Sequence, residues 1–224
     1  EDALAPVRAL DLPGFRVETL TLCYAREDGM ERALQALFQA CDAAYARGAN
    51  IVVLSDRGVR ADRPALPSLL AVSALEQYLV RTKKRTAVSV VIESAEARDS
   101  HQMALLVAYG ARAVCPYLAH ACVRALCAQG KIAAPAQEAV ATFDRALTDG
   151  VLHIAAKMGV STIQAYQSAQ LFEAVGLNAD LVERYFTNTP HRLGGVNLAR
   201  IEADALWHHD RAFALPADAP LERV

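Results

Sequence analysis

Polar side chains that could carry chemistry follow three short apolar stretches of the sequence. They are Ser55, Asp56, Arg57, Glu93 and Tyr117. If the three stretches are parallel strands, these residues lie at one edge of a sheet, where α/β proteins gather functional groups. Such a set could bind a small anion. It could equally hold itself together, with Asp56 accepting hydrogen bonds from local backbone amides and Arg57 pairing with Glu93, and we favour this ion pair.

A second group of candidates lies at a short corner between two helical patterns, where Lys157, Ser161 and Thr162 stand close together. Ser161 and Gln164 have the spacing of a capping box, in which two side chains satisfy the free N–H groups of a helix start. Together with a lysine, such N–H groups could bind an anion or meet a neighbouring domain. His101 begins another predicted helix and could reach the sheet edge, although a lone histidine is more often a packing or surface residue.

Composition excludes several classes of function. The chain has 23 Lys and Arg against 25 Asp and Glu, a formal charge of −2, so no basic excess favours nucleic acid. No apolar run approaches the roughly 20 residues that span a bilayer, and we expect a cytoplasmic chain. The odd number of cysteines indicates reduced thiols. Cys115, Cys122 and Cys127 include no C-x-x-C pair, so we expect buried structural thiols there and no metal site.

Recognisable catalytic motifs are missing from the sequence. It contains no glycine-rich phosphate loop, no H-E-x-x-H and no G-x-S-x-G pattern. His208, His209 and Asp210 are successive residues of a predicted helix, where neighbours point about 100° apart, so they cannot converge on a metal. The residues alone therefore indicate a polar sheet edge without a catalytic set.

The elements that position these residues alternate between strand and helix. Strands are expected to begin near residues 17, 50, 86 and 111, each followed by a helical pattern. This alternation indicates parallel strands with right-handed helical connections. About four strands are too few for a closed eight-stranded barrel. We therefore predict an α/β domain, either an incomplete (β/α) barrel or an open parallel sheet, followed by a helical C-terminal part.

The predicted organisation is an N-terminal arm at residues 1–15, the α/β domain at 16–213 and a C-terminal tail or linker at 214–224. After residue 130 the apolar spacing predicts helices only, with a polar, glycine-bearing loop between the last two. These helices are 138–158 (with a break at Gly150), 162–175, 181–185 and 198–213, and the loop is 187–195.

Five segments of the chain resemble a known family when they are taken together and in order. They are 53–58 (VLSDRG), 87–94 (AVSVVIES), 101–119 (HQMALLVAYGARAVCPYLA), 152–166 (LHIAAKMGVSTIQAY) and 185–195 (YFTNTPHRLGG). The chain resembles the central domain of the glutamate synthase large subunit, of the ferredoxin- and NADPH-dependent family. The last segment adds Arg192 to the candidates, next to His191, which replaces the Ser of a Thr-x-Ser-Arg sequence.

The resemblance implies a place in a multidomain enzyme. Glutamate synthases carry a glutaminase domain, an FMN barrel with an iron–sulfur cluster, and a C-terminal β-helix. Ammonia released in the first domain aminates 2-oxoglutarate in the second. The central domain links the two, so the resemblance implies a connecting chain that contributes to the ammonia route, holds neither FMN nor the cluster, and is not catalytic alone. The alternative is a stand-alone relative that binds a small anionic metabolite, for which a homodimer would complete the half-barrel.

Overall fold

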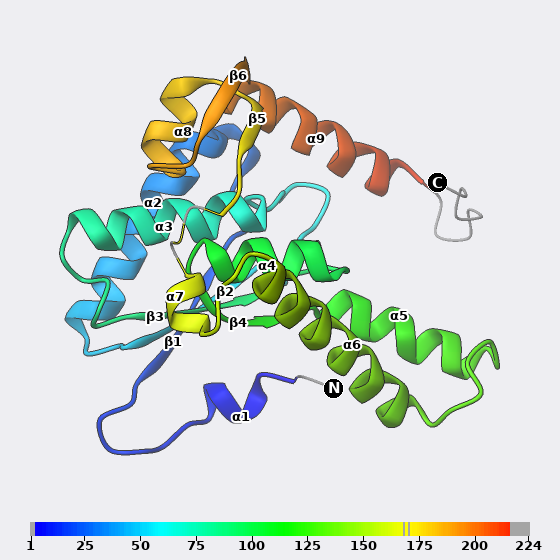
Figure 1. Cartoon of the computed structure of the whole chain (residues 1–224). Coiled ribbons are helices and arrows are strands. Elements are labelled where there is room, and N and C mark those ends of the chain that lie inside the picture. The colour runs from blue at the N-terminus through cyan, green and yellow to red at the C-terminus, as the bar shows by residue number, and fades with distance from the viewer. Residues whose placement is uncertain (1–2, 168, 170, 216–224) are drawn as a thin grey trace.

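A four-stranded parallel sheet forms the centre of the protein. The computed structural model describes residues 3–167, 169 and 171–215, and Figure 1 shows their arrangement. The strands lie in the order of the sequence, and the predicted α/β fold with about four parallel strands is confirmed. They are β1 (Val17–Thr21), β2 (Ile51–Ser55), β3 (Ser89–Glu93) and β4 (Ala111–Cys115).

Three helices cover one face of this sheet. They are α2 (Gly29–Ala46), which follows a short 3₁₀ turn (Arg26–Asp28), α3 (Ser68–Arg81) and α4 (Ser100–Ala108). Their leucines pack with Leu54 and Ile92 into the main apolar core. β2 reads as a continuous apolar run because it is covered on both faces. The capping box of this region belongs to α4, where Asp99 accepts from the Gln102 amide.

The opposite face of the sheet is covered by the N-terminal arm. Its residues form a short helix, α1 (Ala5–Arg8), which lies below the sheet in Figure 1. Leu4 is only 8% exposed and packs with Val53, Val91 and Cys115. The arm is therefore part of the packed domain, because a parallel sheet is stable only when both faces are covered.

Two antiparallel helices follow β4. They are α5 (Tyr117–Ala128) and α6 (Ala136–Lys157), and the expected break at Gly150 does not occur. A Cβ atom on Gly150 would lie 2.0 Å from the Ser100 Oγ atom, so the glycine allows α6 to cross α4 closely. The expectation of buried thiols is wrong for Cys122, which is exposed, and for Cys127, which is half-buried. Only Ala119 and His120 of α5 are buried, so its cysteines lie on outer faces.

The C-terminal part differs most from prediction. The helix expected at 162–175 ends after one turn as α7 (Ile163–Tyr166), and Val175 lies in a strand. The chain leaves the helix because Tyr166 is fully buried and the Gln167 side chain donates to the Ala111 carbonyl, 3.0 Å away. The predicted stretch includes residues 168 and 170, which lie outside the described residues.

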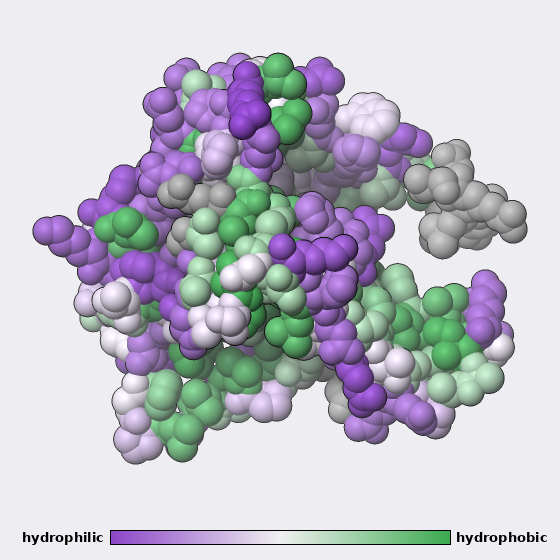
Figure 2. All heavy atoms as spheres, in the orientation of Figure 1, coloured by the Kyte–Doolittle hydropathy of each residue, from purple (hydrophilic) through white to green (hydrophobic). Residues whose placement is uncertain are grey.

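The loop expected at 187–195 contains a strand. The elements of this part are β5 (Ala174–Leu177), α8 (Ala179–Tyr185), β6 (His191–Val196) and α9 (Leu198–Ala214). β5 and β6 form a separate parallel pair. A Cβ atom on Gly195 would lie 2.2 Å from the Gly176 carbonyl oxygen, so glycine is needed where the two strands approach. In Figure 2, green apolar atoms lie on the surface at the top, where Figure 1 places these strands.

Candidate functional site

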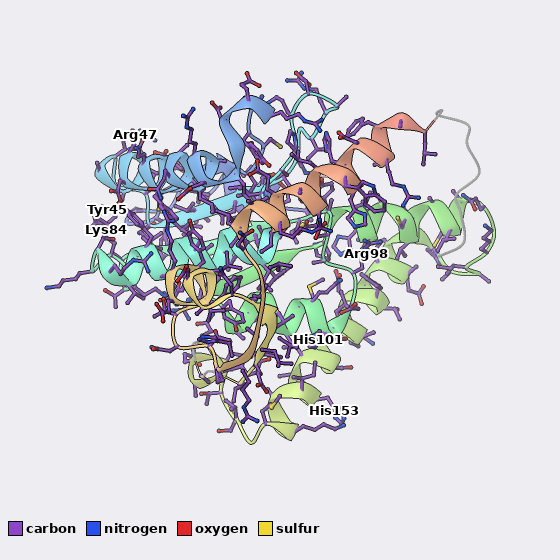
Figure 3. All side chains as sticks on the ribbon, turned by 90° about the horizontal axis from the view of Figure 1, so that it is seen from above. Tyr45, Arg47, Lys84, Arg98, His101 and His153 are labelled. Atoms are coloured by element: carbon purple, nitrogen blue, oxygen red, sulfur yellow. The ribbon has the colours of Figure 1, made fainter. Side chains whose placement is uncertain are left out.

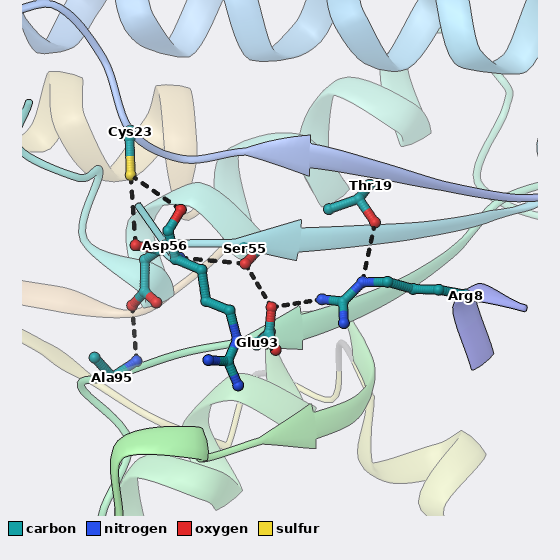
Figure 4. Close-up of polar contacts among 8 residues, drawn as sticks. Arg8, Thr19, Cys23, Ser55, Asp56, Glu93 and Ala95 are labelled. Atoms are coloured by element: carbon teal, nitrogen blue, oxygen red, sulfur yellow. Dashed lines mark hydrogen bonds and ion pairs between the residues drawn. The ribbon is translucent and has the colours of Figure 1, made fainter. Parts of the chain in front are cut away.

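Glu93 lies at the centre of a polar cluster at the carboxyl edge of the sheet (Figure 4). It is the last residue of β3 and stands in register with Ser55, the last residue of β2. The Ser55 hydroxyl donates to Glu93 Oε2 at 2.5 Å, and Arg57 Nε donates to Glu93 Oε1 at 2.6 Å. The predicted ion pair of Arg57 with Glu93 is confirmed.

A third donor comes from the N-terminal arm. Arg8 donates to Glu93 Oε2 at 2.6 Å and to the Thr19 hydroxyl at 3.4 Å. The Glu93 side chain is fully buried, and a buried carboxylate is tolerated only where charges and hydrogen bonds compensate it. Two guanidinium groups and a hydroxyl supply that compensation.

Asp56 is held by the backbone beyond β3. The Ala95 amide donates to Asp56 Oδ2 at 2.7 Å, which confirms the expected contact with a local amide. Burial raises the pKa of Asp56, and the Ala95 amide and the Tyr117 hydroxyl oppose that rise. The Cys23 thiol donates to the Asp56 carbonyl oxygen at 3.4 Å. The loop after β2 is thus fixed from two neighbouring strands.

Tyr117 closes the cluster on the side of α5. The Arg57 guanidinium lies 4.0 Å from the centre of the Tyr117 ring, a cation–π contact. Burial raises the pKa of Tyr117, and the nearby Asp56 carboxylate raises it further, so the phenol stays protonated at neutral pH. We call Arg8, Ser55, Asp56, Arg57, Glu93 and Tyr117 the edge cluster.

The hydrogen bonds and ion pairs of the edge cluster hold separate segments of the chain together. Glu93 accepts three side-chain hydrogen bonds, so most of its lone pairs are occupied and it is a poor general base. Its two guanidinium partners remain partly open to water, with exposed side-chain fractions of 26% for Arg8 and 42% for Arg57. The guanidinium groups of the cluster therefore lie toward the surface and the Glu93 carboxylate lies inside.

Five of the predicted candidates lie outside the edge cluster. His101 is exposed on the outer side of α4 and meets the Phe172 ring edge-on at 5.9 Å between ring centres (Figure 3). The corner with Lys157, Ser161 and Thr162 lies beside Gln167, which binds the first residue of β4 and so marks the amino edge of the sheet. The corner therefore faces away from the edge cluster.

The predicted capping box at the corner has a different form. Thr162, not Ser161, is the capping residue, and its hydroxyl accepts from the Ala165 amide at 3.2 Å. Arg192 lies in β6 with an 86% exposed side chain, 3.5 Å from Glu173. These residues are separate from the edge cluster, as His101 is.

Arg8 is the functional candidate that sequence reasoning missed. It lies in a stretch with two prolines and a glycine, which indicates an arm. The only local signal is that Leu4 and Val7, which precede Arg8, are apolar, and both pack on the sheet. The partner of Arg8 is 85 residues away in the sequence, so only the tertiary fold reveals the contact.

Among the residues that the structure describes, no group of three or more His, Cys, Asp or Glu side chains is placed to hold a metal ion. Asp210 instead forms two 2.6 Å hydrogen bonds with Arg26. None of the described helices combines the length and the apolar character that crossing a bilayer requires.

Known proteins match this chain over most of its length. A model of the family described as the glutamate synthase central domain matches residues 1–178. The chain belongs to this family. It is 38% identical over 201 residues to the glutamate synthase [NADPH] large chain of Bacillus subtilis, covering 90% of this chain and 13% of that protein. It is 36% identical over 217 residues to the glutamate synthase [NADH] of Schizosaccharomyces pombe, covering 95% and 10%.

The central domain is a small part of these relatives. The chain is also 36% identical to the chloroplastic ferredoxin-dependent glutamate synthase of Spinacia oleracea, over 84% of this chain and 12% of that protein. It thus spans between 10% and 13% of the length of these three relatives. The family model ends one residue after β5, so β6 and α9 lie beyond the matched central domain.

Proposed function

We propose that this chain is the connecting domain of a glutamate synthase, lying between a glutaminase domain and an FMN domain, and that it is not catalytic alone. The observation that carries the proposal is the family match over residues 1–178. The edge cluster supports it, because its carboxylate is occupied by three donors of the same chain. In this proposal FMN and the iron–sulfur cluster are held by the other domains.

The edge cluster would fix the surface that a neighbouring domain meets. Arg8 and Arg57 are partly exposed and already anchored on a buried carboxylate, so little side-chain entropy is lost when a partner docks on them. We propose that this edge borders the route along which ammonia passes between the two active sites.

Complex formation tests the proposal. The chain and the remaining domains of the same synthase would be produced as separate polypeptides, mixed, and examined by size-exclusion chromatography with light scattering. A complex of one chain with the remainder is expected, and substitution of Arg57→Glu should weaken it more than the matched charge change Arg200→Glu on α9. A chain that does not associate with those domains is not a connecting domain.

A second candidate function is favoured by the paired guanidinium groups. A stand-alone relative could bind a small anionic metabolite at Arg8 and Arg57, with Tyr117 as a wall. Thermal unfolding in the presence of phosphate, glutamine and 2-oxoglutarate tests it. A rise in Tm that Arg57→Met abolishes is expected, and no rise with any of the three compounds contradicts this function.

A further inference from the structure

The β5–β6 pair carries the most exposed apolar side chains of the described residues. Val175 is 68% exposed and Leu193 is 64% exposed, and no other large apolar residue among those described exceeds 56%. The two residues are opposite each other in the register of the pair. They therefore form one small apolar surface and are not scattered single residues, which would need no explanation.

The pair is also incomplete as a sheet. Parallel sheets occur almost only where both faces are covered, and two strands alone are marginally stable in water. Among the described residues β6 pairs with a single strand, and Arg192, Leu193, Gly194 and Gly195 in its centre are all exposed. A Cβ atom on Gly194 would meet nothing within 4 Å, so there is room beside the strand.

The edge of β6 has few guarding side chains. Soluble proteins usually guard edge strands with charges, prolines or bulges, because unpaired backbone groups attract other strands. The register of β6 with β5 shifts at two places, which mark bulges or irregularities, but the only charged side chain of β6 is Arg192, and Leu193-Gly194-Gly195 follows it. A strand that adds to such an edge gains main-chain hydrogen bonds and places alternate side chains on the exposed face.

The place where the family match ends indicates which part of the synthase could pair with β6. The family model ends at residue 178, between β5 and α8, so the pair joins one strand inside the matched domain to one strand beyond it. The relatives are far longer than this chain, which covers 13% of the Bacillus subtilis protein. The β5–β6 pair is thus where the central domain passes into the chain that follows it.

We propose that β6 accepts a further β-strand from the part of the synthase that follows the central domain, and that this strand covers Val175 and Leu193. The inference rests on the proposed function, because it needs a synthase that contains this chain. The fitting segment is extended and rich in β-branched or aromatic residues on the side that faces Leu193. It carries an acidic residue near Arg192, whose side chain is 86% exposed and lies 3.5 Å from Glu173.

Hydrogen–deuterium exchange of the full chain tests this inference. Exchange at residues 191–196 would be followed in the chain alone and in its complex with the remaining synthase domains. We expect these amides to exchange at least tenfold more slowly in the complex, while the amides of the exposed arm loop at 10–15 keep their rate. If a complex forms and residues 191–196 exchange as they do in the free chain, the docking surface is refuted and the connecting function stands. If no complex forms, both fail.

A pair of variants separates docking from folding. Leu193→Asp should raise the Kd of the complex at least tenfold, while Leu152→Asp, at a 52% exposed site on α6, should leave it unchanged. Both sites are exposed, so the two variants are expected to change the Tm of the free chain by the same amount. Equal Kd values for the two variants would overturn the inference. Protection of residues 191–196 in the chain alone, lost on dilution, would also overturn it, since a second copy would then be the occupant.

Discussion

Removing the two arginines from Glu93 should reveal how a fully buried carboxylate is held. Each single change, Arg8→Met or Arg57→Met, leaves Glu93 with one guanidinium and the Ser55 hydroxyl. Hydrogen bonds to charged groups contribute about 1.5–3 kcal/mol, and both arginines are partly exposed, so we expect each single variant to lose about 1–2 kcal/mol of unfolding free energy.

The double variant should lose more than the sum of the single variants. It leaves the buried Glu93 carboxyl group without a cation, which costs about 3–5 kcal/mol. The two substitutions should therefore be coupled by about 1 kcal/mol or more in a double-mutant cycle. Adding Glu93→Gln to the double variant removes the buried charge and should restore about 1 kcal/mol or more.

Urea unfolding followed by circular dichroism at pH 7 measures all of these variants. Arg200→Met is the matched control, because Arg200 and Asp204 form an exposed pair at 3.1 Å on α9 that should contribute less than about 0.5 kcal/mol. Strictly additive losses, or a triple variant no more stable than the double, would refute the view that the charge on Glu93 depends on both arginines.

Three further outcomes are expected. Gly150→Ala should destabilise the protein by about 1–3 kcal/mol in urea unfolding, because the added methyl group overlaps Ser100, and Ser100→Gly should relieve that loss. Burial raises the pKa of the Asp56 carboxyl group, so the folded state binds this proton more tightly than the unfolded state and the free energy of unfolding falls as the pH rises above about 4. The Asp56→Asn variant cannot lose this proton, so it should gain stability relative to the parent from pH 4 to pH 7. The opposite trend would contradict the raised pKa. Iodoacetamide at pH 8, with mass spectrometry, should label exposed Cys122 well before Cys41, whose pKa burial raises to about 11.

Much of the sheet could be predicted because its signals are local. Ile51–Ser55 is an apolar run ended by polar residues, and such a run has few alternatives to a buried parallel strand. Once two strands are placed side by side, the residues at their ends are adjacent, which is why the pairing of Arg57 with Glu93 could be expected from the sequence.

The remaining features depend on contacts between distant parts of the chain. Residues 162–175 have helical apolar spacing, yet Val175 gains backbone pairing with a strand that comes 16 residues later. Arg8 carries no pattern of its own and is recognised only through Glu93. His101 begins a predicted helix and is expected to reach the sheet edge, but in α4 it is exposed and contacts the Phe172 ring.

The position of α1 decides whether this four-stranded sheet could be completed to a barrel. In a closed eight-stranded barrel, the face that α1 covers would become the lumen, which is just wide enough for the side chains of its own strands. A helix with its side chains is about 10 Å across and does not fit there. Any closure of the barrel by strands added at β1 and β4, from a second copy or from another domain, must first expel Leu4 and Arg8 and leave Glu93 with one arginine. The N-terminal arm therefore opposes closure of the sheet into a barrel.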